Sequence, residues 1–143
     1  MSSLLRPKPR FFLDRGLGAV AVPSALRDAG WQVATMDEVY GADQSQLVQD
    51  IEWIRDQTAA GYCLLTKDTR IAHDPAEAEA IWMSDARVVT LTSAKITAAT
   101  MVERLLKHSE TIHSWARSVP PPFVLGVSAT RIRRVRLRYP PGR

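Results

Sequence analysis

The feature that most constrains the fold is a short, uninterrupted apolar run that ends at an acidic residue. Residues 62–66 read Tyr-Cys-Leu-Leu-Thr, between Gly61 and a Lys-Asp pair that ends at Asp68. Such a run is typical of a strand buried on both faces of a sheet, although its length also fits one buried helical turn. The same pattern occurs at residues 11–13, Phe-Phe-Leu, which Asp14 follows directly. Ligands bind at the carboxyl edge of open parallel sheets, so Asp14 and Asp68 are the first candidate site residues.

Helical and extended patterns alternate along the rest of the chain. Helices are expected within residues 17–29, 50–60, 74–83 and 96–116, and further strands at 31–36, 87–92 and 123–127. The third of these helices starts with a cap and a proline, and the fourth is expected to be one long amphipathic helix capped by Thr97. The acidic segment 37–43 is expected to be a polar connection. The alternation predicts an α/β domain with a mostly parallel sheet.

Length and cysteine content indicate the setting of the protein. The 143 residues suffice for one domain with its own core. Cys63, the single cysteine, falls inside the expected buried strand and cannot form an internal disulfide. The amino terminus lacks an apolar stretch of signal-peptide length, and no segment approaches a membrane span. These features predict a soluble, cytoplasmic protein with no membrane association.

Positive charge is concentrated at the two ends of the chain, whereas the interior is net acidic. The formal net charge is +4, and the last residues carry six arginines, among them Arg133, Arg134, Arg136 and Arg138. Basic ends around an acidic centre suit a protein that holds a polyanion near carboxylates. A solvated tail, or an arm that docks on a partner, explains the same charge. The alternating sequence of residues 134–139 favours an edge strand or an extended basic arm.

A divalent cation needs several oxygen ligands, so a third acid should join Asp14 and Asp68. Asp50 is the best candidate, because a helix that runs antiparallel to the Asp68 strand begins near the carboxyl end of that strand. Asp50 would also serve as a helix N-cap, and its spacing alone favours the cap. Glu77 fits a capping box with Asp74, which is its favoured role, although it should lie close to Asp68. No nucleophile motif or phosphate-binding loop is present.

The motifs together resemble the PIN-like ribonuclease family, in particular the VapC-type toxins of toxin–antitoxin pairs. The segments that carry the resemblance are Phe11–Gly18, Ala25–Trp31, Asp50–Ile54, Leu64–Ile71 and Pro75–Glu77. Their order and spacing agree with the family from about Phe11 to Val127. We therefore assign residues 1–127 to a PIN-like domain and residues 128–143 to a basic arm or edge strand.

The resemblance implies a three-layer α/β/α sandwich and a metal-dependent ribonuclease. Asp14, Asp50 and Asp68 would be the catalytic residues and would hold Mg²⁺ or Mn²⁺, with Glu77 as a further candidate ligand. The resemblance thereby favours the metal role of Asp50 over the cap. Residues expected to contact RNA phosphates are Arg15, Lys67, Arg133, Arg134, Arg136 and Arg138.

The implied partners are an RNA substrate and a cognate antitoxin protein, with a homodimer as a further option. Two other functions stay open at this point. One is a non-catalytic PIN-like module that binds RNA or protein, which the set of three acids disfavours. The other is a Mg²⁺-dependent phosphatase on a similar sheet. Phosphatases of the haloacid-dehalogenase type use a second aspartate two positions after the first, whereas Gly16 stands two positions after Asp14.

Overall fold

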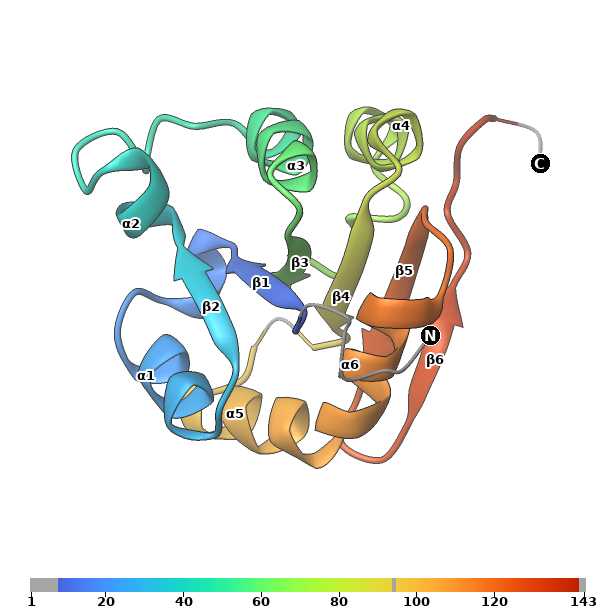
Figure 1. Ribbon diagram of the computed structural model, residues 1–143. Helices are drawn as coiled ribbons and strands as arrows, with labels where there is room; N and C mark the ends of the chain where they lie inside the picture. The colour runs from blue at the N-terminus through green and yellow to red at the C-terminus, as the bar shows by residue number, and fades with distance from the viewer. Residues whose placement is uncertain (1–7, 94, 142–143) are drawn as a thin grey trace.

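A twisted six-stranded sheet with helices on both faces forms the centre of the molecule (Figure 1). The computed structural model describes residues 8–93 and 95–141. The strands lie in the order β2-β1-β3-β4-β5-β6; all neighbours are parallel except β5 and β6, which are antiparallel. The strands are β1 (Arg10–Leu13), β2 (Gln32–Thr35), β3 (Cys63–Thr66), β4 (Arg87–Leu91), β5 (Phe123–Val127) and β6 (Ile132–Val135). The expected α/β fold with a mostly parallel sheet is confirmed.

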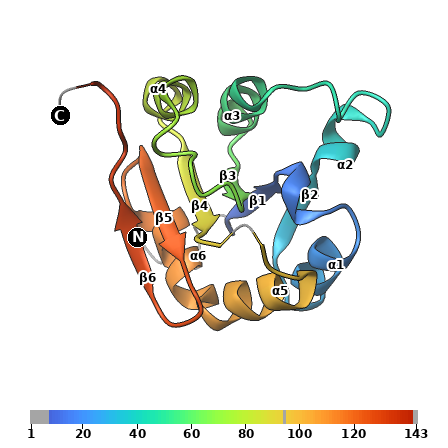
Figure 2. The same cartoon turned by 180° about the vertical axis from the view of Figure 1, so that it is seen from behind.

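The helices divide into two layers (Figures 1 and 2). Helices α1 (Ala21–Asp28), α5 (Ala98–Lys107) and α6 (Ser109–Ser118) cover one face. Helices α2 (Met36–Tyr40), α3 (Asp50–Ala59) and α4 (Pro75–Ser84) cover the other. One turn of 3-10 helix, η2 (Arg15–Leu17), follows β1. The α/β/α sandwich is therefore as expected. No helix in the described parts of the chain combines the length and apolar character needed to cross a membrane.

The central strands are largely apolar because each contributes to two cores. Neighbouring residues of a strand point to opposite faces. Phe11 accordingly packs with the α1, α5 and α6 layer, whereas Phe12 packs with the α2, α3 and α4 layer. All four residues of β3 are buried. Burial on both faces explains the uninterrupted apolar runs and excludes the helical-turn interpretation of residues 62–66.

The strand register brings two acidic segments together. Leu13 of β1 pairs with Leu65 of β3, and the Asp14 N–H donates to the Leu65 carbonyl at 3.0 Å. Asp14 and Asp68 therefore leave neighbouring parallel strands at the same carboxyl edge of the sheet. Helices α3 and α4 begin at this edge as well, because each returns antiparallel to the strands that it covers. The topology thus places Asp50 and Glu77, both in first turns, beside the strand ends.

Two sequence-based expectations were wrong. Residues 37–43 are not simply a polar connection, because Met36–Tyr40 forms α2 with a capping box between Thr35 and Glu38. Residues 96–116 are not one long helix: α5 ends at Lys107 and α6 begins at Ser109, with the break at His108. Thr97 caps α5 as expected, accepting a hydrogen bond from the Thr100 N–H at 3.1 Å.

The segment after Val127 is partly an edge strand and partly irregular. β6 pairs with β5, and the chain then continues beside α4, where the Arg138 N–H donates to the Ala72 carbonyl at 2.9 Å. The Tyr139 ring lies 6.4 Å from the ring of Trp82. The chain as far as Tyr139 therefore stays in contact with the domain, and its path runs beside α4 (Figure 1).

Candidate active site

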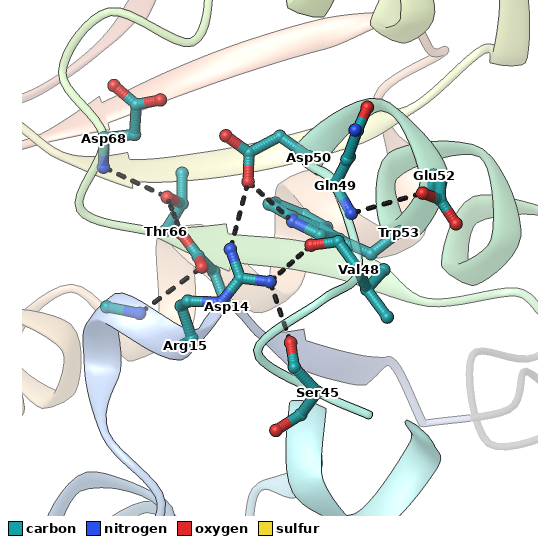
Figure 3. A network of polar contacts seen from close by, with 11 residues as sticks. Asp14, Arg15, Ser45, Val48, Gln49, Asp50, Glu52, Trp53, Thr66 and Asp68 are labelled. Carbon is teal, nitrogen blue, oxygen red and sulfur yellow. Dashed lines mark hydrogen bonds and ion pairs between the residues drawn. The ribbon is translucent and has the colours of Figure 1, made fainter. Parts of the chain in front are cut away.

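Asp14 and Asp68 are linked by the hydroxyl of Thr66, the last residue of β3. Thr66 Oγ1 donates to Asp14 Oδ2 at 2.7 Å and accepts a hydrogen bond from the Asp68 N–H at 3.0 Å (Figure 3). Asp14 Oδ1 also accepts from the Gly16 N–H at 3.3 Å. One buried side chain therefore orients the first carboxylate and the backbone that carries the second.

The environment of Asp14 opposes its ionisation. Burial raises the pKa of this carboxyl, and the nearby charge of Asp50 acts in the same direction. The hydrogen bonds from Thr66 and Gly16 oppose that shift of the pKa, because they stabilise the ionised form. Asp14 is thus a buried carboxyl whose charge would be favoured by a nearby cation.

Asp50 is the first residue of α3, and its side chain is fixed from two sides. Trp53 Nε1 donates to Asp50 Oδ1 at 3.0 Å, and Arg15 Nη1 lies 3.6 Å from the same oxygen (Figure 3). The N-cap of this helix is Gln49, which forms a capping box with Glu52. The cap interpretation of Asp50 was therefore wrong, and its carboxylate faces the acidic edge.

Arg15 contacts the segment that leads into α3 and fixes its position. Its guanidinium donates to the carbonyls of Ser45 and Val48 and also contacts Asp50 (Figure 3). Through the carbonyls of Ser45 and Val48 and the carboxylate of Asp50, Arg15 holds residues 45–50 against η2. Both hydrogen bonds come from Nη2, so this end of the guanidinium is engaged inside the molecule, whereas Nε is buried without a partner among the described residues.

Glu77 completes a cluster of three carboxylates. One oxygen each from Asp50, Asp68 and Glu77 lies within 4.8 Å of the others. Asp74 caps α4 by accepting from the Glu77 N–H at 3.0 Å, but no return bond from the Glu77 side chain completes a capping box. The favoured local role of Glu77 was therefore wrong, and its side chain points to the other acids.

The pKa of the Glu77 carboxyl lies far above its usual range. Burial raises the pKa of its carboxyl to about 9, and the hydrogen bond and charge of Asp68 act in the same direction. Its Oε1 is buried without a hydrogen-bond partner among the described residues. An unpaired buried oxygen beside two other carboxylates is a position that a cation would stabilise.

The structure brings the expected acids to one edge but does not make them equivalent. Asp50, Asp68 and Glu77 form the close group, whereas Asp14 lines a hollow of about 310 Å³ together with Asp50, Asp68 and Lys67. Thr66 and Trp53 were not among the site residues expected from the sequence. Both could have been found by spacing, because Thr66 precedes Asp68 by two residues and Trp53 follows Asp50 by three.

The other residues expected to contact RNA lie at different places. Lys67 lines the hollow beside Asp14 and passes close to Gly16. Arg133 and Arg134 are in β6, and the guanidinium of Arg134 stacks on Trp115 at 5.5 Å from the ring centroid. Arg136 and Arg138 follow β6 and are exposed. These four arginines do not line the hollow that contains Asp14, Asp50 and Asp68.

Comparisons with known proteins agree with this architecture. The family described as "PIN like domain" matches residues 9–93. The chain is 36% identical over 133 residues to "Putative ribonuclease VapC45" of Mycobacterium tuberculosis (strain ATCC 25618 / H37Rv), covering 93% of this chain and 96% of that protein. No solved structure matches the chain significantly. The matched region of the family includes β1 to β4 and all four acids at the edge, namely Asp14, Asp50, Asp68 and Glu77.

Proposed function

The chain belongs to the PIN-like domain family, and we propose that it is a metal-dependent endoribonuclease, the toxin of a toxin–antitoxin pair. The observation that carries the proposal is the approach of Asp50, Asp68 and Glu77 to within 4.8 Å at the carboxyl edge. The name of the mycobacterial relative supports RNA as the substrate. A cognate antitoxin as partner, a homodimer and a cytoplasmic location are parts of the same proposal.

The donor set suits a hard divalent cation, and we propose Mg²⁺ or Mn²⁺. Both prefer carboxylate oxygens, and Mg²⁺ is commonly held by a few carboxylates and several waters. The unpartnered Oε1 of Glu77 and the raised pKa of its carboxyl support this proposal, because a cation bound there would stabilise the ionised carboxylate. Asp50, Asp68 and Glu77 would hold the cation, with Asp14 beside them. When bound, it supplies an activated water and stabilises charge on the attacked phosphate.

The chain's own residues would position the reacting groups. Thr66 holds Asp14 and the Asp68 backbone, and Trp53 holds Asp50. Lys67 lines the same hollow and is a candidate contact for the phosphate of the scissile bond. Arg15 would contribute charge near that phosphate rather than a free guanidinium fork. Arg133, Arg134, Arg136 and Arg138 are proposed contacts for more distant phosphates.

The experiment is an RNA cleavage assay with the full chain, in the presence of Mg²⁺ or Mn²⁺ and in excess EDTA. Asp68→Asn should abolish metal-dependent cleavage, because it removes one ligand charge. Asparagine still accepts the hydrogen bond that Asp68 Oδ1 receives from the Arg70 N–H at 2.9 Å, so the loop should keep its conformation.

The matched control is Asp85→Asn at the other end of α4. Asp85 is exposed and has a φ of 55°, a left-handed conformation that asparagine tolerates well. This variant should cleave RNA like the parent. Cleavage that survives EDTA, or an active Asp68→Asn variant, would refute the proposed function.

A further inference from the structure

A second charged surface lies at the amino edge of the sheet, opposite the acidic cluster. Lys8, Arg10, Arg87 and Arg117 line one hollow of about 590 Å³. They come from four places in the chain: the residues before β1, the first residue of β1, the first residue of β4 and the end of α6. We call these four residues and the hollow between them the basic groove.

The charges of the basic groove have no acidic partner among the described residues. The described residues form two ion pairs, Arg15–Asp50 and Arg27–Glu38, and both lie outside the groove. No carboxylate of the described residues therefore lies within 4.0 Å of any of the four cations. Arg87 Nε is buried and has no hydrogen-bond partner within residues 8–93 and 95–141. A buried guanidinium nitrogen without an acceptor costs free energy unless a ligand or water satisfies it.

Two of the cations are held in place by backbone carbonyls at helix ends. Lys8 Nζ donates to the Gly30 carbonyl at 2.7 Å, and Arg10 donates to the Ala60 carbonyl and stacks on the Tyr62 ring at 4.4 Å. Gly61 makes this possible, since a Cβ at that position would lie 2.8 Å from Arg10 Nη2. Two of the four cations of the groove, Lys8 and Arg10, are therefore held in position by contacts within the domain.

Helix ends alone do not neutralise the groove. The carboxyl ends of α1, α3 and α6 lie at this edge, and each helix end carries a partial charge of about −0.5. Three such ends offset roughly 1.5 of four positive charges. A net positive charge of about 2 or more is left for a ligand, and Arg87 and Arg117 make no hydrogen bond to a carbonyl in the described structure.

The chemistry of the surroundings favours nucleic-acid phosphates over a protein partner. Protein interfaces rely on buried aromatic or aliphatic anchors at their centre. The large exposed apolar side chains of the described residues are Val20, Val39, Leu47, Trp82 and Met83, and none lines the basic groove. The groove instead offers three guanidinium groups, which match phosphate oxygens in bidentate geometry.

The groove also has room for more than one phosphate. A neighbouring hollow of about 520 Å³ shares Lys8 and Arg117 with it, so the two hollows lie side by side on this surface. That neighbour contains one acid, Glu110, and the Trp31 and His113 side chains. Positive charge is therefore densest at the Arg10 and Arg87 end.

We propose that the basic groove is a second RNA-binding site, which holds backbone phosphates of the substrate at the edge opposite the acidic cluster. The inference rests on the proposed function for the identity of its ligand. Binding at this groove requires no chemistry, so it is testable without cleavage. RNA that extends beyond the acidic edge and around the domain would reach it, whereas a short oligonucleotide bound at the acids would not.

The test measures binding of fluorescent single-stranded RNA to the full chain in EDTA, by fluorescence anisotropy over a range of salt concentrations. The variant is Arg87→Gln with Arg117→Gln, and RNAs of about 4 and about 16 nucleotides span the site sizes common in single-strand binding proteins. Each lost single-strand phosphate contact reduces the slope of log affinity against log salt by about 0.7. Two contacts correspond to a slope change of about 1.4 and to roughly 25-fold weaker binding at 0.1 M salt.

The control is Arg55→Gln with Arg104→Gln, which removes the same charge from one exposed and one half-buried position outside the groove. We expect the groove variant to lose slope and affinity for the long RNA only, and the control to keep both. If Arg87→Gln impairs folding, as circular dichroism would show, Lys8→Gln with Arg117→Gln replaces it, since both positions are exposed.

Three results would overturn the inference: an equal loss in both double variants, an unchanged slope in the groove variant, or a loss for the short RNA as well. Competition by an acidic polypeptide, without any effect of the groove variant on RNA, would assign the surface to a protein instead. A parent chain that binds RNA through the groove but does not cleave it would refute the proposed function and leave this inference standing.

Discussion

Replacing Thr66 by valine tests how the acidic edge is held together. Thr66 is 1% exposed, and valine matches its shape while removing the hydroxyl. The change deletes the 2.7 Å hydrogen bond to Asp14 Oδ2 and the acceptor of the Asp68 N–H. A hydrogen bond to a charged group contributes about 1.5–3 kcal/mol, and an N–H left without a partner costs about 1 kcal/mol or more. Burial of the methyl group that replaces the hydroxyl stabilises the folded state by about 1 kcal/mol.

The net loss of stability should therefore be about 2–3 kcal/mol at neutral pH. For a chain of this size it corresponds to a fall in Tm of roughly 5–10 °C. The loss should also depend on pH. The Thr66 hydroxyl lowers the pKa of folded Asp14, so its contribution is present above that pKa and is lost as pH falls through it.

Thermal or urea unfolding from pH 4 to pH 8, followed by circular dichroism, measures both effects. Thr90→Val is the matched control, because Thr90 is also buried but donates to the neutral carbonyls of Asp68 and Leu91. Its cost should be about 1 kcal/mol and independent of pH. An equal and pH-independent loss in both variants would show that Asp14 does not depend on Thr66 for its charge.

Further predictions concern the other acids and the basic groove. Trp53→Phe removes the donor to Asp50 Oδ1 and should weaken Mn²⁺ binding about tenfold in calorimetry, and because Trp53 is fully buried the smaller ring should also lower the free energy of unfolding. The pKa of folded Glu77 is raised from 4.5 to about 9, so without metal the free energy of unfolding should fall as pH rises through this range. Glu77→Gln or millimolar Mg²⁺ should remove that fall, and an unchanged pH profile in Glu77→Gln would contradict it. Gly61→Ala should cost about 1 kcal/mol or more in unfolding, because φ is 94° and the new Cβ meets Arg10.

The fold was largely predictable because its signals are local. Strands buried on both faces must be apolar throughout, so Phe11–Leu13 and Cys63–Thr66 could be recognised from the sequence. The short helix α2 was missed although Thr35 and Glu38 have capping-box spacing, because the acidic composition of the segment suggested a solvated connection. The break at His108 was missed because Leu105 and Ile112 are seven residues apart, which keeps both on one face across two turns.

The site was predictable only as far as strand ends and helix starts define it. Asp14 and Asp68 follow from that rule, since parallel strands share one carboxyl edge. Asp50 was the best third candidate, although its spacing alone favoured a helix cap and only the family resemblance favoured the metal role. For Glu77 the spacing favoured a capping box and the resemblance added it as a further candidate ligand, because spacing cannot show whether a side chain turns back to its helix or toward Asp68. The basic groove could not be predicted, because Lys8, Arg10, Arg87 and Arg117 are distant in sequence and only the sheet register brings them together.

Anomalous diffraction from crystals of the full chain soaked in Mn²⁺ would test the central claim most directly. We predict one strong manganese peak between the carboxylates of Asp50, Asp68 and Glu77, with oxygen atoms at about 2.0–2.3 Å. The same soak of Asp68→Asn crystals should show that peak weakened or lost. A manganese peak elsewhere on the molecule, or none at these carboxylates in crystals of a preparation that cleaves RNA, would contradict the account.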